Sequence, residues 1–261
     1  MKLKYLATAA AAMIAASPAF AIIGDPLLPN SEMFLTVWSQ TGTAGGTANA
    51  SYTFDTGVRV LDMLANTNTN LFINKVVSGN ADWASFLTFT GGNGLNFNVT
   101  GGTAGGAGDT TGNVAIQTVS GASMGTTTNL TLDNSEAEIS VFLGAVNSTG
   151  NHSTVANGWS FATAGDPYFM NVPRNTWNGN LPQNSKAVGT TAVVGSYTQN
   201  GFGVSFATSK QFEGNFFFGQ TTPSVYALQY QVAAVPEPTG YAMALAGLGL
   251  IGFVGSRRRK S

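Results

Sequence analysis

The chain has 261 residues, no cysteine and a formal net charge of −1 at pH 7, so a disulfide scaffold and a thiolate metal site are excluded. Charged residues make up 9% of it, against about 25% in an ordinary soluble domain. Apart from the two ends of the chain, five basic residues face eleven carboxylates, and so sparse a positive charge argues against a nucleic-acid partner.

The N-terminus has the composition of a secretory signal peptide. Two lysines precede an apolar run over residues 6–16, and Ala19 and Ala21 supply the small side chains that signal peptidase requires. We therefore predict a signal helix within residues 1–21, with cleavage after Ala21. A retained membrane anchor is the alternative, but the apolar run is too short to span about 30 Å of hydrocarbon.

Residues 22–234 have the pattern of one β-rich extracellular domain. Short apolar or alternating runs recur between Gly, Asn, Asp and Ser residues, which is typical of strands. The runs cover residues 34–38, 51–54, 86–89, 95–99, 114–119, 130–132, 139–143, 159–162, 192–197, 202–206, 216–218 and 225–232. They favour an all-β fold, a β-sandwich or jelly roll, over a parallel sheet, which would need intervening helices. One helix is predicted, over residues 58–65.

Few residues of this domain have the chemistry of a catalytic or metal site. His152 is the only histidine and no Gly-x-Ser-x-Gly elbow accompanies it, so we expect it in an exposed loop. The glycine- and threonine-rich residues 41–47 and 100–106 lack the lysine and the following helix of a phosphate-binding loop and are predicted to be plain loops. We predict no catalytic residue and no cofactor, and hence a protein that is not an enzyme.

Asp133, Glu136 and Glu138 form the densest acidic cluster. Their oxygens would suit a hard cation such as calcium, although the spacing does not fit an EF-hand loop. We expect a solvated strand edge there, with a metal site as the weaker alternative. The same carboxylates and the four tryptophans of the chain leave a second function open, a carbohydrate-binding module or weak polysaccharide hydrolase.

A Pro-Glu-Pro motif opens the last segment, residues 235–261. It consists of Val235, Pro236, Glu237 and Pro238. Prolines lack amide protons and restrict their neighbours, so the motif is predicted to be extended and accessible to a processing enzyme. Residues 240–255 carry no charge, and as a helix they would cover about 24 Å of a hydrocarbon core of about 30 Å. We predict a transmembrane helix, with a buried core helix as the alternative.

Four adjacent cations end the segment: Arg257, Arg258, Arg259 and Lys260. Such a cluster stays in the cytoplasm, while its long side chains reach back to the membrane surface. It would therefore act as a membrane stop that leaves residues 22–234 on the outer side of the inner membrane. A core helix needs neither a proline-rich start nor terminal cations.

The order of these three parts resembles the PEP-CTERM sorting domain of Gram-negative bacteria that form biofilms and exopolysaccharide. The resemblance covers about a tenth of the chain. It implies processing by an exosortase, a membrane cysteine transpeptidase, in addition to the signal peptidase. It also implies a single-pass inner-membrane intermediate that is later displayed on the cell surface or in the extracellular matrix. The leading hypothesis for residues 22–234 is a non-enzymatic structural or adhesive component associated with exopolysaccharide.

Overall fold

The computed structural model describes residues 23–28, 31–39, 49–104, 112–152, 154–155, 157–166, 185–233 and 248. The helices in this part of the chain are α2 (Val60–Ala65), α3 (Ala81–Thr90) and α4 (Asn129–Asn147). The strands are β1 (Glu32–Ser39), β2 (Ala50–Arg59), β3 (Asn74–Val76), β4 (Asn96–Thr103), β5 (Val114–Val119), β6 (Trp159–Thr163), β7 (Lys186–Ala187), β8 (Thr191–Thr198), β9 (Thr208–Thr222) and β10 (Val225–Val232). The described chain is mostly β, as the sequence predicts.

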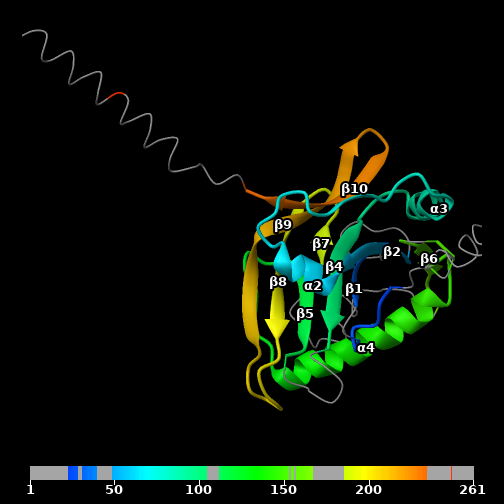
Figure 1. Ribbon diagram of the computed structural model, residues 1–261. Coiled ribbons are helices and arrows are strands. Elements are labelled where there is room, and N and C mark those ends of the chain that lie inside the picture. Colours follow the sequence, from blue (N-terminus) through cyan, green and yellow to red (C-terminus); the bar gives the residue numbers. More distant parts are fainter. Residues whose placement is uncertain are drawn as a thin grey trace, which may run out of the picture.

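These strands form one curled antiparallel sheet (Figure 1). Their order is β3-β10-β9-β8-β5-β4-β1-β2-β6, and β7 pairs with the start of β4. Because the sheet curls, Tyr52 near one end and Tyr230 near the other belong to the same hydrophobic core. The prediction of two packed sheets differs from this arrangement, since the described strands belong to a single sheet whose concave side encloses the core.

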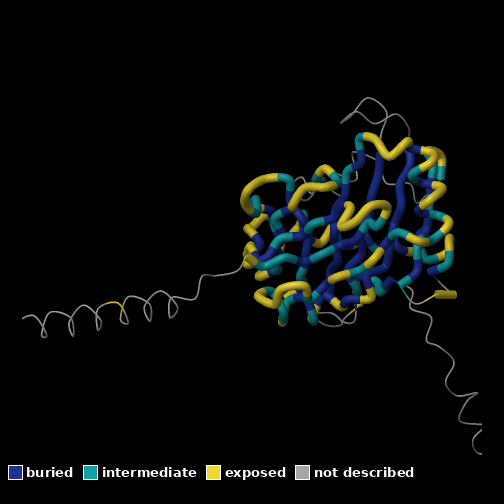
Figure 2. Tube along the Cα trace, turned by 90° about the horizontal axis from the view of Figure 1, so that it is seen from above, coloured by how far each residue is buried: buried dark blue, intermediate teal, exposed yellow. Residues whose placement is uncertain are grey.

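Strand β1 shows that the sheet is covered on both faces. Its residues Met33, Leu35 and Val37 pack into the concave core, whereas Phe34 and Trp38 belong to a second core that includes the buried face of α4. Successive side chains of a strand point to opposite faces, so a strand buried on both sides is apolar at nearly every position. Figure 2 shows the interior strands buried and the surrounding loops largely exposed.

Helix α3 closes the open side of the curl. The ring of Trp83 lies 5.1 Å from that of Tyr52 on β2 and 5.0 Å from that of Tyr226 on β10. On the next turn of the helix, Phe86 contacts Phe161 of the edge strand β6, with 6.2 Å between ring centroids. The helix therefore joins the two ends of the sheet through aromatic contacts, where no backbone hydrogen bonds between the described end strands do so.

Three runs predicted to be strands are helical instead. Residues 86–89 lie in α3, and residues 130–132 and 139–143 lie in α4. The buried residues of α4 recur three or four positions apart, as a helix requires: Asn129, Leu132, Ser135, Glu136, Ile139, Phe142, Leu143 and Val146. Three polar side chains within this buried stripe interrupt its apolar pattern, and for this reason the strand prediction was wrong.

Other local predictions have mixed outcomes. The helix predicted over residues 58–65 is present as α2, although it begins two residues later. Residues 202–206 form an exposed connection between β8 and β9, with only an isolated bridge at Phe206. Residues 100–103 belong to β4 and not to a loop, because Gly101 and Gly102 let neighbouring groups approach within 3.0 Å of where a Cβ would lie. Residues 41–47, and residues 105–106 of the second predicted loop, lie outside the described residues.

Candidate binding grooves beside the β9–β10 hairpin

The hairpin of β9 and β10 projects from the body of the domain and carries a pair of facing side chains (Figure 1). Gln220 and Tyr226 are partners in the register of the two strands, so their side chains lie on the same face of the hairpin. A groove lies on each side of this pair, with volumes of about 530 and 540 Å³. Volumes of this size are typical of small-ligand sites.

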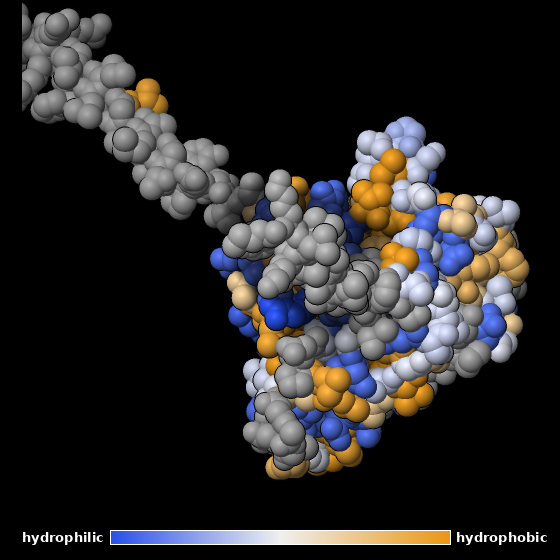
Figure 3. All heavy atoms as spheres, turned by 45° about the vertical axis from the view of Figure 1, so that its right-hand side comes forward, coloured by the Kyte–Doolittle hydropathy of each residue, from blue (hydrophilic) through white to orange (hydrophobic). Residues whose placement is uncertain are grey.

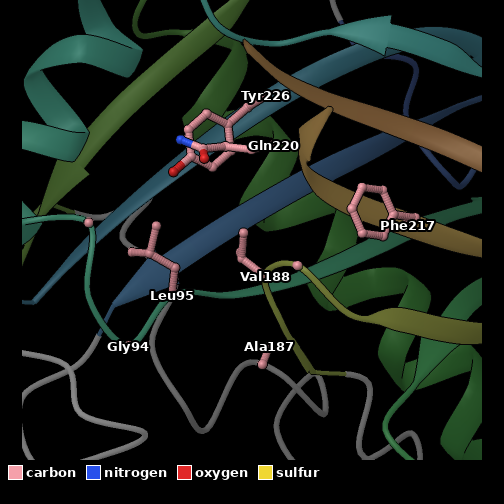
Figure 4. A pocket seen from close by; sticks show the side chains of 9 residues that line it. Gly94, Leu95, Ala187, Val188, Phe217, Gln220 and Tyr226 are labelled. Atoms are coloured by element: carbon pink, nitrogen blue, oxygen red, sulfur yellow. The ribbon is translucent and has the colours of Figure 1, made fainter. Parts of the chain in front are cut away.

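The first groove separates the hairpin from the segments that flank β4 and β7 (Figure 4). It is lined by Gly92, Gly94, Leu95, Ala187, Val188, Gly189, Phe217, Gln220 and Tyr226. Two backbone hydrogen bonds fix its wall: Val188 N donates to Leu95 O at 2.9 Å, and Gly189 N donates to Phe218 O at 2.8 Å. The groove is therefore held open by the sheet itself.

The second groove lies between the hairpin and α3. Its lining consists of Ser78, Gly79, Asn80, Ala81, Trp83, Ala84, Leu87, Gln220, Ser224 and Tyr226. The backbone of Tyr226 is anchored here, since its carbonyl accepts from Val77 N at 2.9 Å and its N–H donates to Ser78 Oγ at 3.0 Å. Both grooves thus share one aromatic ring whose backbone is fixed by hydrogen bonds.

Glycines give both grooves stretches of bare backbone. Gly92 and Gly189 in the first groove and Gly79 in the second have φ values of 68°, 87° and 104°. Apart from their chain neighbours, no atom of the described residues lies within 4 Å of the place where a Cβ would stand at any of the three. Because an L side chain rarely adopts these φ values, glycine at these positions leaves the peptide groups accessible to a ligand.

Asn80 holds the second groove together, because its side chain joins three elements. Its Oδ1 caps α3 by accepting from Trp83 N at 2.7 Å, and its Nδ2 donates to the Tyr52 hydroxyl and to Val77 O, each at 2.9 Å.

We expect the Asn80→Ala variant to lose about 2 kcal/mol of unfolding free energy, since it removes a helix cap and leaves a buried hydroxyl with one partner fewer. Urea denaturation of the variant and wild type measures this difference. Asn93, an exposed asparagine just beyond the other end of α3, provides the control, and its alanine variant should change stability by less than about 0.5 kcal/mol. Equal losses in the two variants would contradict the assignment.

Among the described residues that line the two grooves, the phenol of Tyr226 is the only ionisable side chain. A charged ligand would lose its hydration there without gaining a partner of opposite charge. The described lining also includes none of the carboxylates, histidines and lysines that general acid–base or nucleophilic chemistry requires. Their aromatic, amide and backbone groups therefore fit the binding of an uncharged polar molecule.

The acidic residues singled out in the sequence do not converge on a site. All three lie on α4, where Asp133 is exposed, Glu138 is half-buried and Glu136 is fully buried, so the expected strand edge is a helix. Burial, together with the nearby charge of Asp133, raises the pKa of Glu136 to about 8, although Asn113 Nδ2 donates to its Oε2 at 3.0 Å. Within the described residues, no three His, Asp or Glu side chains are grouped to hold a metal ion.

His152 is buried, which corrects the expectation of an exposed loop histidine. It is 0% exposed, and burial lowers its pKa to about 4. Its Nε2 lies 3.3 Å from Ser160 Oγ, and no hydrogen-bond partner of its Nδ1 is found among the described residues. A serine nucleophile would need its histidine accessible and oriented by a carboxylate, and neither condition is met here.

The tryptophans considered for sugar stacking are mainly core residues. Trp38 and Trp83 are 1% and 2% exposed, Trp159 is half-buried, and Trp177 lies outside the described residues. The aromatic side chain that lines both grooves is instead the half-buried Tyr226. Sequence reasoning missed it because the register of the hairpin brings its partner Gln220 opposite it. This register shifts between Val225 and Tyr226, and no residue pattern predicts that shift.

The sorting and processing residues predicted at the two ends of the chain all lie outside the described residues: Ala19, Ala21, Val235, Pro236, Glu237, Pro238, Arg257, Arg258, Arg259 and Lys260. The two terminal segments also lie outside them, except for Leu248. In the part of the chain that the structure describes, no helix combines the length and the apolarity needed to cross a membrane.

Comparison with known proteins found no matching curated protein and no matching solved structure. The family model of the PEP-CTERM protein-sorting motif, however, matches residues 234–260, so the chain carries the sorting signal of an exported protein that an exosortase processes through a membrane-anchored intermediate.

Proposed function

We propose that this protein is a non-enzymatic component of the cell surface or extracellular matrix, displayed next to exopolysaccharide. The observation that carries the proposal is the sorting motif at residues 234–260. In this proposal a signal peptidase acts after Ala21, and residues 240–255 hold the protein in the inner membrane. The cations at residues 257–260 keep the C-terminus in the cytoplasm until an exosortase acts near Pro236 to Pro238.

The distribution of ionisable groups supports a role without catalysis. Glu136 and His152 are each fully buried. A buried and inaccessible group does not transfer protons to a substrate, because a general acid or base must come within hydrogen-bond reach of it. A structural or adhesive role requires no such group.

The second candidate, a polysaccharide hydrolase, needs two carboxyl groups on either side of a bound sugar, about 5 to 10 Å apart. Among the described residues neither groove beside the hairpin contains a carboxylate, and the sequence candidate Glu136 lies on the buried face of α4. Binding of carbohydrate without hydrolysis is therefore the better supported form of this alternative.

The sorting step is tested by changing Pro236, Glu237 and Pro238 together to alanine. We expect the wild-type protein at the cell surface with a processed C-terminus, and the variant in the inner-membrane fraction with its C-terminus intact, because the exosortase no longer recognises it. Cell fractionation and mass spectrometry of the C-terminus measure both properties. Thr239→Ala, the residue directly after the motif, is the matched control. Unchanged delivery and an unchanged C-terminus in the triple variant would refute the proposal.

A further inference from the structure

We propose that the two grooves beside the β9–β10 hairpin bind an uncharged polysaccharide, which passes over the facing pair Gln220 and Tyr226. The inference rests on the proposed function in one respect, namely that display next to exopolysaccharide supplies the ligand. The site itself is argued from the geometry of the hairpin.

The facing pair has the two kinds of groups that a sugar ring requires. The ring of Tyr226 is half-buried and packs against Trp83 and Phe218, with centroid distances of 5.0 and 6.1 Å. These contacts hold it in place, and its remaining surface provides an aromatic face for the C–H groups of a sugar. Gln220 is exposed next to it, and its amide both donates and accepts hydrogen bonds, as sugar hydroxyls do.

The charge of the surroundings selects an uncharged ligand. An acidic polysaccharide would meet no lysine or arginine among the described residues that line the two grooves, and the acidic body of the domain would repel it. Hydrophobic and hydrophilic residues are mixed over the visible described surface (Figure 3). Such a surface suits hydroxyl groups better than an apolar chain.

The position of the pair favours a polymer over a single sugar. Gln220 and Tyr226 line both grooves, so a ligand that contacts them can continue into the groove toward β4 and β7 or into the groove toward α3. Bare backbone at Gly92, Gly189 and Gly79 provides further hydrogen-bonding groups along this path. Both walls are fixed by backbone hydrogen bonds, so little conformational entropy is lost when a chain binds.

The test is the retardation of the protein in native gels that contain a polysaccharide. The full chain is expressed in cells that process it and is purified in a polyoxyethylene detergent, because sugar-headed detergents would compete for the site. Hydroxyethyl cellulose and dextran serve as uncharged probes and alginate as the anionic probe. The variants are Gln220→Ala and Tyr226→Leu, and Gln211→Ala is the matched control, since Gln211 is also exposed on β9 but near its other end.

We expect at least one uncharged polymer to retard the wild type, and Gln220→Ala to bind it about 5- to 10-fold more weakly. Tyr226→Leu should weaken binding by about 10-fold, while Gln211→Ala should bind as wild type does. Tyr226 also packs against the core, so weaker binding by Tyr226→Leu supports the site only if the thermal unfolding of this variant remains cooperative. The side chain of Gln220 is exposed, so Gln220→Ala tests the site whatever the outcome for Tyr226→Leu.

Three results would overturn the inference: no retardation by either uncharged polymer, equal retardation of Gln220→Ala and wild type, or retardation by alginate as strong as by the uncharged polymers. These outcomes are independent of the sorting test. A correctly delivered protein that fails to bind refutes the groove assignment alone, whereas a binding protein that is not delivered refutes the proposed function alone.

Discussion

The Glu136→Gln variant is expected to be more stable than wild type by about 2–4 kcal/mol at pH 7 and to differ little from it near pH 4. The pKa of Glu136 rises from 4.5 to about 8 on folding, chiefly because burial on the inner face of α4 penalises the carboxylate. Between these two values the unfolded chain releases a proton that the folded protein retains, so the wild type loses stability as the pH rises from about 4.5 to about 8. Glutamine is uncharged throughout and can still accept from Asn113.

Urea denaturation of both proteins at several pH values between 4.5 and 8 measures this difference. Two other buried groups also make the unfolding free energy depend on pH, with slopes of opposite sign to each other. Burial raises the pKa of Asp55 to about 7 and lowers that of His152 to about 4. Asp55 lowers stability as the pH rises toward 7, and His152 lowers it as the pH falls from 6.5 toward 4. Both groups are present in both proteins and cancel in the difference. Glu213→Gln, which changes an exposed carboxylate on β9, is the control. A difference that is independent of pH would contradict the assignment.

Replacing Trp83 by alanine is expected to cost about 3–5 kcal/mol of unfolding free energy, the range for removing a large buried aromatic side chain. Trp83 is 2% exposed and contacts Tyr52, Phe218 and Tyr226. These residues come from three strands near the two ends of the sheet, so the variant loses the packing that closes the curl and not only a local contact.

Chemical denaturation of two companion variants shows whether this position is special. Phe89→Ala changes an aromatic side chain on the same helix that is 50% exposed, and it should cost less than about 1 kcal/mol. Trp83→Phe should cost only about 1–2 kcal/mol, because it keeps an aromatic ring and removes a buried indole N–H that has no hydrogen-bond partner among the described residues. A loss from Trp83→Ala as small as that from Phe89→Ala would contradict the closing role of α3.

The strands were predictable from the sequence where one local pattern decides the structure. Residues 95–99 alternate between apolar and polar side chains, and strand β4 contains nearly all of them, with Phe97 and Val99 in the concave core. The sorting signal was predictable for a similar reason: its three parts follow one another directly along the chain, and the family model matches them.

Helix α4 was not predicted, because its buried stripe includes Ser135 and Glu136. A polar side chain in a core position is tolerated only through tertiary contacts, such as that of Glu136 with Asn113, and these are absent from any local pattern. Helix α3 offered a signal that was overlooked, since Asn80 and Gly91 are typical residues for the two ends of a helix.

The candidate site could not be predicted from the sequence at all. Gln220 and Tyr226 are brought opposite each other by the register of the hairpin, and the grooves beside them are completed by the turn before β4 and the turn after β7. The burial of His152 likewise depends on segments around it: a Cβ at Gly158 would lie only 2.5 Å from the Cα of His152. Such close approaches are properties of the folded chain and not of a segment.

Strand β10 carries Tyr226 near its first residue and ends at Val232, directly before the sorting segment. A pulling force on a polymer held at Tyr226 would thus reach the C-terminal attachment of the domain through seven residues of a single strand. That strand pairs with β9 along its whole length, so the tension would run along the hydrogen-bonded ribbon and leave the core beneath α4 unloaded. Force applied between the bound polymer and the C-terminal attachment would therefore not unfold the hydrophobic core of the domain.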